Sequence, residues 1–299
     1  MRGRLSRLLR AASVVGVASV SLSACDASEY ERTLSSLARA TAAPALTATG
    51  PVPTAAPSSA PAAAFHPPTY PNANPDPQRW PNLYVLPPTR AVISLFTTIR
   101  DKSTPHGRFA AAADRLMRLL AEEGLAQLPG AEHVTVTTPC GTFDGLRSAH
   151  PKNVIAVSIV RAGDTLLEAA RAICPQVSVG KILIQRDEAD DLKRPKLFYI
   201  KLPPGTGTSV QAVLLVDPML ATGQSAKLAI RELLARGVAE ESIVFLNVVA
   251  CPEGLDALFA AHPQVRIVTG AVDSHLNAQR YICPGLGDFG DRFFGTIEP

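Results

Sequence analysis

The sequence predicts an α/β fold in which a central parallel sheet is flanked by helices. Runs that are apolar throughout recur along the second half of the chain, and candidate helices lie between several of them. Strands buried on both faces show such continuous apolar runs, and the helices that alternate with them cover both sides of a parallel sheet. With 299 residues, of which 46% are hydrophobic, the chain can bury one substantial core.

Each expected element follows from a local pattern. A helix is expected at 107–126, where one side is apolar: Phe109, Ala113, Leu116, Leu119 and Leu120. The strand candidates are 154–160, 181–185, 210–216, 243–250 and 265–269. Further helices are expected between several of them, at 163–173, 224–236 and 254–261. Ligands bind such sheets at the carboxyl ends of the strands, where Arg161 and Asp217 are expected to lie.

The N-terminal region is expected to hold a targeting segment followed by a linker. Residues 1–25 contain four arginines and no acidic residue, and their run of Ala, Val and Ser is too short to span a membrane. Eleven of the 26 prolines lie between residues 41 and 81, among Ala, Ser and Thr. This composition predicts a disordered linker over 26–78 and a folded domain over 79–299.

The same region bears on the destination of the protein. An arginine-rich start without acidic residues is typical of transit segments, so we expect an organelle, with a plastid as the first choice and the cytoplasm as the alternative. The residues Leu22–Cys25 also fit a bacterial lipoprotein cleavage box, which leaves an exported form open. No segment predicts a membrane-spanning helix.

Charge and cysteine usage exclude several classes of protein. Residues 82–299 hold 22 basic and 22 acidic residues, so nothing favours a nucleic-acid partner. The five cysteines show no CxxC spacing, and the six histidines form no HxxxH or HExxH pattern. Free thiols in a reducing compartment are therefore expected rather than disulfides or a metal site.

The stretch 214–230 has the order of a phosphate-binding strand, loop and helix. An apolar run ends at Asp217, small residues follow, and Ser225 opens an amphipathic helix. This order directs backbone N–H groups and a helix N-terminus at one point, which suits a phosphate, while Thr222 adds a hydroxyl and Asp217 can accept hydrogen bonds from sugar hydroxyls. A phosphorylated ribose fits both features. An ordinary strand-to-helix turn is the alternative, and the absence of GxxxxGK[ST] disfavours a P-loop kinase.

Three further segments carry polar residues in unusual settings. Residues 281–296 (YICPGLGDFGDRFFGT) predict either a tight loop that closes on a flat ligand or a glycine-rich loop packed under Phe293 and Phe294. Residues 159–163 (IVRAG) predict a strand that ends in Arg161. Residues 185–188 (QRDE) open a charged stretch up to Pro204 that is long enough for a mobile lid.

Together these segments resemble uracil phosphoribosyltransferase, in its eukaryotic-type form. The match runs from about Asn82 to Thr296 and includes TTIRDKSTPHGRF, SIVRAG, VGKILIQRDE, LVDPMLATG and PGLGDFGDRFFGT. The resemblance implies the type I phosphoribosyltransferase fold, with a mobile lid and a C-terminal base-binding loop. Gln224 departs from the family pattern, which often has Gly at this position.

The resemblance also implies a reaction and a set of site residues. The 5-phosphoribosyl group of 5-phosphoribosyl 1-diphosphate would pass to uracil, giving UMP and diphosphate in pyrimidine salvage, with Mg2+ held mainly by the diphosphate and water. Catalytic roles would fall to Asp288 and Arg186. The donor would contact Arg161, Arg186, Asp217, Pro218, Met219, Leu220, Ala221, Thr222, Gly223, Gln224, Ser225 and Asp288. Uracil would contact Ile282, Gly287, Asp288 and Phe289, with no protein ligand to the metal.

The remaining expectations concern partners and rivals. The resemblance implies a homodimer or homotetramer and leaves a GTP effector open. Lys102 is left between a structural and a functional role, whereas Asp291 and Arg292 are expected to hold the terminal loop. Two alternative hypotheses remain. The first is a regulator of the same fold without turnover; such a protein would be free to lose Arg161, Arg186, Asp217 and Asp288, but all four are present. The second is an enzyme acting on a purine, which the glycine-rich C-terminal loop disfavours.

Overall fold

The computed structural model describes residues 76–148, 151–186, 195–208 and 212–296. The chain divides into two compact units, 1–63 and 64–299, and every described residue belongs to the second. The expected targeting segment, and the expected linker as far as residue 75, lie outside the described residues. Within the described ranges, no helix has the length and apolar character needed to cross a membrane.

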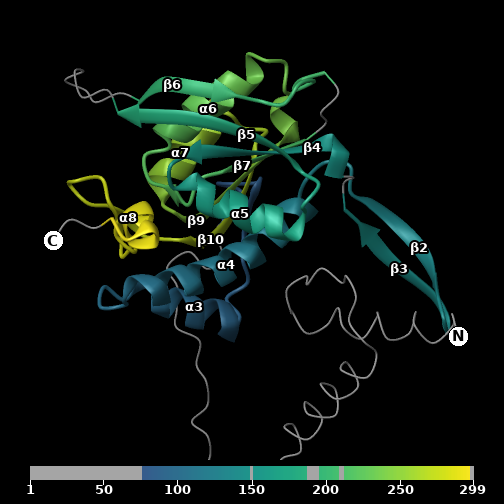
Figure 1. Cartoon of the computed structure of the whole chain (residues 1–299), viewed down its shortest axis with the longest axis horizontal. Helices are drawn as coiled ribbons and strands as arrows, with labels where there is room; N and C mark the ends of the chain where they lie inside the picture. Colours follow the sequence, from purple (N-terminus) through teal and green to yellow (C-terminus); the bar gives the residue numbers. More distant parts are fainter. Residues whose placement is uncertain (1–75, 149–150, 187–194, 209–211, 297–299) are drawn as a thin grey trace, which may run out of the picture. The chain divides into compact units, whose positions relative to one another are not determined.

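An eight-stranded sheet forms the centre of this unit (Figure 1). Its strand order is β1-β10-β9-β7-β4-β5-β6, and β8 pairs with β9 beside this path. All neighbours are parallel except β5 and β6. The bounds are β1 Leu83–Val85, β4 Val154–Val160, β5 Ser178–Arg186, β6 Pro195–Lys201, β7 Ala212–Val216, β8 Met219–Leu220, β9 Ile243–Ala250 and β10 Arg266–Val272. The expected, mostly parallel sheet is thus confirmed.

Helices cover both faces of the sheet because its central strands are apolar on both sides. Ala156 of β4 belongs to a core that also holds residues of three helices, α3 Arg90–Arg100, α4 His106–Ala126 and α5 Gly163–Ile173. Its neighbours Ile155 and Val157 point to the opposite face, where they share a core with residues of α6 Gln224–Leu234 and α7 Pro252–Ala261. Successive strand residues alternate between faces, so each central strand contributes to both cores.

One expectation about these elements needs correction, and another stays a prediction. Leu119 was expected on the apolar side of α4, but it is 41% exposed, because the buried stripe follows the i, i+4, i+7, i+11 positions 109, 113, 116 and 120. The stretch from 185 to 204 was expected to be a mobile lid. Within this stretch, residues 195–201 form β6, an edge strand antiparallel to β5, and the mobility of the stretch stays a prediction. Residues 187–194 lie outside the described part of the chain.

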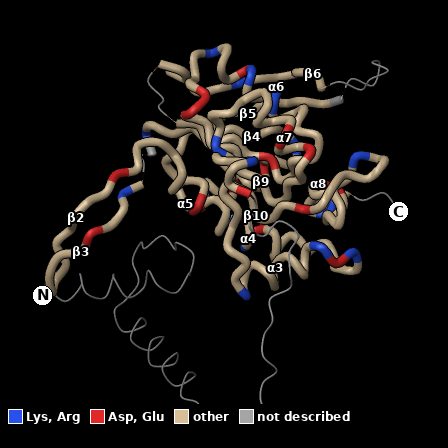
Figure 2. The backbone as a smooth tube through the Cα atoms, turned by 180° about the vertical axis from the view of Figure 1, so that it is seen from behind, with Lys and Arg blue, Asp and Glu red and all other residues tan. Residues whose placement is uncertain are grey.

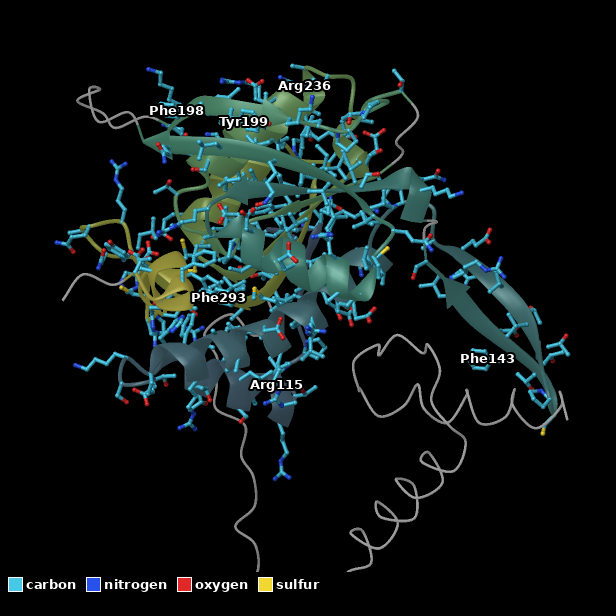
Figure 3. All side chains as sticks on the ribbon, in the orientation of Figure 1. Arg115, Phe143, Phe198, Tyr199, Arg236 and Phe293 are labelled. Atoms are coloured by element: carbon cyan, nitrogen blue, oxygen red, sulfur yellow. The ribbon has the colours of Figure 1, made fainter. Side chains whose placement is uncertain are left out.

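The remaining elements are short or peripheral. A hairpin, β2 Glu132–Thr138 with β3 Gly141–Arg147, extends from the body of the unit and carries the exposed Phe143 (Figures 1 and 3). The 3-10 turns η2 Pro151–Asn153 and η3 Glu240–Ser242 precede β4 and β9. Near the C-terminus, β11 His275–Leu276 pairs with β12 Ile282–Cys283, and α8 Phe289–Phe294 follows.

The N-terminal edge of the unit is anchored to α7. Trp80 is 3% exposed in the core between the sheet and that helix, and its indole N–H donates to Asp256 over 2.9 Å. Arg79 makes a two-point contact with the same carboxylate, at 3.2 and 2.6 Å. Strand β1 then adds to the sheet beside β10. Residues 79–85 are therefore integral to the fold.

Candidate functional site

A cavity of about 810 Å³ lies where the end of α3, the end of β4 and the C-terminal segment meet. Its walls mix basic, acidic and apolar side chains, and Figure 2 shows acidic and basic residues in the neighbourhood of α8. The lining residues are Arg100, Lys102, Arg161, Pro284, Leu286, Gly287, Asp288, Asp291, Arg292 and Thr296. The position matches the expectation that a ligand binds where the parallel strands end.

The loop after β7 has the expected geometry for an anion. The strand ends at Val216, and α6 begins at Gln224. The residue before the helix, Gly223, has a φ of 73°, a left-handed conformation that glycine adopts without steric cost. No side chain of the described residues caps this helix. The first N–H groups of α6 therefore remain for a ligand, and the helix dipole favours a negative one.

Asp217, at the start of this loop, has an unusual carboxyl. Burial, with a smaller contribution from the nearby carboxylate of Asp288, raises its pKa to about 7, although the hydrogen bond from the N–H of Met219 acts in the opposite direction. Asp288 belongs to the C-terminal loop and caps α8 by accepting the N–H of Asp291 over 2.8 Å. Two acids expected to contact the donor therefore lie close together, although they come from distant segments.

Arg161 follows β4 directly, and its side chain lines the cavity. Its guanidinium lies 2.5 Å from the carboxylate of Asp291 and 3.3 Å from the hydroxyl of Thr296. Hydrogen bonds from Thr296 and Arg161 hold the pKa of Asp291 below its usual range. The ring of Phe294 lies 5.8 Å from the same guanidinium. Arg161 is thus both an ion-pair partner and a wall of the cavity.

The other predicted residues fall into three groups. Phe289 is 1% exposed and packs edge-to-face against Phe109 at 5.5 Å, and Ile282 is also buried, so the side chains of these two residues belong to the core. Gly287 and Asp288 line the cavity directly. The backbone of Arg186 ends β5, while its side chain lies outside what the structure describes.

The reasoning from sequence missed Arg100, which lines the cavity, and its ion-pair partner Asp273. Arg100 forms an ion pair with Asp273, which has only 2% of its side chain exposed and follows β10 directly. The available signal was weak, because the predicted strand 265–269 ended four residues before Asp273, whereas the observed strand extends to Val272. Lys102, whose role was left undecided from the sequence, also lines the cavity. Arg292 holds the terminal loop, as expected, and lines the cavity as well.

The fold and this site define the class of protein. A mostly parallel sheet with a glycine-containing loop between one strand and a helix, an arginine at another strand end and a separate C-terminal loop is the arrangement of type I phosphoribosyltransferases. The family model for uracil phosphoribosyltransferase matches residues 86–296. The chain belongs to the uracil phosphoribosyltransferase family. Its reaction is the formation of UMP from uracil and 5-phosphoribosyl 1-diphosphate, a step of pyrimidine salvage.

Individual relatives agree with this membership. The uracil phosphoribosyltransferase of Dictyostelium discoideum is 49% identical over 218 residues, covering 73% of this chain and 98% of that protein. A chloroplastic uridine/cytidine kinase of Arabidopsis thaliana is 42% identical over 219 residues, which cover only 44% of its length. Among solved structures, the AQ2163 protein from Aquifex aeolicus matches with a TM-score of 0.60 and 29% identity, over 73% of this chain and all of that one.

Proposed function

We propose that the cavity beside α8 is the place where the ribosyl donor and uracil meet in this protein. One observation carries the proposal. The phosphate loop and the C-terminal loop approach closely enough for the Asp288 carboxylate to raise the pKa of Asp217, and Arg161 reaches the same cavity. The donor carries a phosphate, a ribose and a diphosphate. It therefore needs a phosphate-binding loop, acceptors for the ribose hydroxyls and a cation for the diphosphate around one point.

The donor would lie along the loop Asp217–Ser225. Its 5′-phosphate would accept hydrogen bonds from the N–H groups at the start of α6, with help from the hydroxyls of Thr222 and Ser225. The ribose hydroxyls would donate to Asp217. Positions 218–221 and 223–224 would serve through their backbone and shape: Pro218, Met219, Leu220, Ala221, Gly223 and Gln224.

The chemistry proposed is direct displacement at the anomeric carbon. The bond from this carbon to the diphosphate oxygen breaks while the bond to N1 of uracil forms, and the N1 proton is released to water, so positive charge develops on the ribose and negative charge on the leaving group. Arg161 and Arg186 would stabilise the leaving diphosphate, and Asp288 would face the ribose. Alignment of the two substrates would supply much of the remaining acceleration.

Mg2+ would enter with the diphosphate and partly neutralise it. Carboxylate oxygens suit this ion and the water molecules it keeps, and Asp217 and Asp288 offer such oxygens near the proposed donor position. We propose that these acids accept hydrogen bonds from that water, while the diphosphate remains the main ligand.

Uracil would be read by backbone groups. Phe289 and Ile282 have buried side chains, and Gly287 has none, so main-chain N–H and C=O groups are what these three residues can offer to the base. Asp288 would contact both substrates because it lines the cavity next to Gly287 and its carboxylate acts on Asp217.

We also propose self-association, as a homodimer or homotetramer. The hairpin β2–β3 supports this because Phe143 is 61% exposed and lies beside its cross-strand partner Val136, which is 39% exposed. Such a cluster favours burial against another surface. A GTP effector remains a proposal that rests on the family resemblance alone.

The cellular location is proposed as an organelle, and a plastid first. The arginine-rich, acid-free start supports it, and one relative is named as chloroplastic. Fusing residues 1–80 to a fluorescent reporter tests the idea. A diffuse signal from an uncleaved fusion would reject it and favour the cytoplasm.

The decisive experiment is an assay of the purified full-length chain. It would be given the donor, Mg2+ and labelled uracil, cytosine or hypoxanthine in parallel. We expect UMP from uracil alone. Donor binding without turnover would favour the regulator, and product from hypoxanthine would favour the purine enzyme.

A further inference from the structure

Arg292 joins the end of α3 to the base loop, which we define as Pro284–Gly287. Its Nη1 donates to the carbonyls of Ile99 and Leu286 over 2.6 and 2.7 Å, and its Nη2 donates to the carbonyl of Asp101 over 2.7 Å. The guanidinium also lies 4.3 Å from the ring of Phe109. One planar side chain therefore fixes three carbonyl groups, and one of them belongs to the base loop.

A second arginine holds the preceding residue of this loop. Arg100 donates to Asp273 over 2.8 and 2.7 Å, and Asp273 in turn accepts the N–H of Gly285 over 2.8 Å. The Nη1 of Arg100 also donates to the carbonyl of Gly285 over 2.8 Å. Both backbone polar groups of Gly285 are therefore fixed by one ion pair, at a φ of 59° where a Cβ would collide with the carbonyl of Ile282.

The hydrogen bond to the carbonyl of Leu286 fixes a group on the next residue. In a trans peptide unit the C=O and the following N–H point in opposite directions. The peptide between Leu286 and Gly287 directs its C=O at Arg292, so the N–H of Gly287 points away from that side chain. This N–H has no hydrogen-bond partner in the described part of the chain, and Gly287 lines the cavity.

We infer that Arg292 and the Arg100–Asp273 pair are positioning residues for base recognition, which aim the N–H of Gly287 at an acceptor oxygen of the pyrimidine. They act through the loop and do not touch the reacting atoms. The inference rests on the proposed function, because it names the groups that orient its base-reading backbone. Arg292 would thus have a role in specificity besides holding the terminal loop. Arg100 at the end of α3 and Asp273 after β10 would share this role.

The test compares Arg292→Met with wild type in the full-length protein. Methionine keeps an apolar stem over Phe109 and removes all three donors. Arg118→Met is the matched control, because Arg118 pairs with Asp114 on the exposed side of α4 and does not line the cavity. The measurements are KM for uracil, the dissociation constant for the donor, the ratio of kcat/KM for uracil over cytosine, and the melting temperature.

We expect Arg292→Met to raise KM for uracil by about tenfold or more, and to lower the uracil-to-cytosine ratio, with donor binding within about twofold. Arg292→Lys should fall between wild type and Arg292→Met, because an ammonium group keeps the charge but cannot donate in the planar geometry of a guanidinium. Asp273→Asn should shift the same ratio and serves if Arg292→Met does not fold. Unchanged uracil KM and selectivity, or equal losses for uracil and donor, would overturn the inference. A wild-type protein that makes no UMP would instead overturn the proposed function.

Discussion

The guanidinium of Arg161 and the carboxylate of Asp291 approach to 2.5 Å and connect the end of β4 to α8. More than a third of each side chain is exposed, at 54% and 37%. Exposed pairs of this kind contribute about 0–1 kcal/mol to folding. The contact is therefore better explained by orientation of Arg161 than by stability, since Arg161 is the cation proposed to meet the leaving diphosphate.

Arg161→Ala should cut kcat/KM for the donor by about two to three orders of magnitude, because a developing negative charge loses a partner. The melting temperature should stay near that of wild type. Asp291→Asn is the matched comparison: it keeps the shape but weakens the orientation, so we expect a loss of only a few-fold. Steady-state kinetics and a thermal scan check both. An Arg161→Ala protein that unfolds yet retains its specific activity would mark Arg161 as a structural ion-pair member.

The carboxyl of Asp217 should make stability depend on pH. Its pKa is raised to about 7 in the folded protein, whereas an unfolded aspartic acid titrates near pH 4. Between these values the unfolded chain releases a proton that the folded chain retains, so the free energy of unfolding falls as pH rises. Below about pH 4 both states are protonated and the group has no effect.

Asp217→Asn should remove this slope. At pH 8 the variant should be more stable than wild type without ligands, by about 1–3 kcal/mol, because no charge is buried beside Asp288. Its turnover should be strongly reduced, because the proposed acceptor for the ribose hydroxyls has become an amide. Urea titrations of wild type and Asp217→Asn at pH 5, 6, 7 and 8 measure the free energy of unfolding of both proteins. Parallel pH profiles for the two proteins would show that Asp217 does not titrate in this window.

The N-terminal edge gives a prediction about truncation. The match to the family begins at residue 86, but Trp80 is buried in the core and β1 lies before that point. Deleting residues 1–78 should leave turnover within a few-fold. Deleting 1–85 should destabilise the domain severely, since removal of a buried tryptophan alone costs about 3–5 kcal/mol.

Trp80→Ala in the full-length chain separates packing from truncation and should reproduce much of the loss. Thermal melts and the soluble yield of the three proteins are the measurements. A chain starting at residue 86 with the wild-type melting temperature would show that β1 and Trp80 are dispensable. Loss of folding on deletion of 1–78 would instead contradict the expected linker.

How far the sequence predicted the structure depended on the range of the interaction. The central strands and α4 were readable because their apolar periodicity is local, and Gly223 was readable because it stands between a strand pattern and a helix pattern. The strand β6 was not, because its exposed Phe198 and charged neighbours resemble a loop until β5 supplies its hydrogen bonds.

The site followed the same rule. Motifs identified Arg161, Asp217 and Gly287 one by one, but nothing local shows that Arg100 pairs with Asp273 or that Arg292 reaches back to α3. These contacts join residues far apart in the sequence, and only the packed structure brings them together. The raised pKa of Asp217 belongs to the same group, because it depends on burial and on Asp288.

Base choice is the last prediction. Uracil presents an acceptor at O4 and a donor at N3, whereas cytosine presents the reverse at both positions. Backbone groups cannot exchange polarity, so cytosine would leave two buried polar groups unpaired, at a cost of roughly 1–3 kcal/mol each. Discrimination in kcat/KM should therefore exceed about a hundredfold in competition assays with both bases.

Gly287→Val tests whether this reading occurs at the proposed loop. Gly287 has a φ of 82°, and the nearest atom to a Cβ there is Cδ of Arg292 at 3.6 Å, so the strain would come from the backbone and the branched side chain rather than from a collision with the wall. The variant should lose UMP formation while it still binds the donor, because the phosphate loop lies elsewhere in the chain.

Gly287→Ala is the control variant for this test; with its smaller side chain, it should lose less UMP formation than Gly287→Val. Calorimetry with the donor and an assay with uracil separate the two effects. Equal use of cytosine by wild type, or normal UMP formation by Gly287→Val, would show that the base is read at another place.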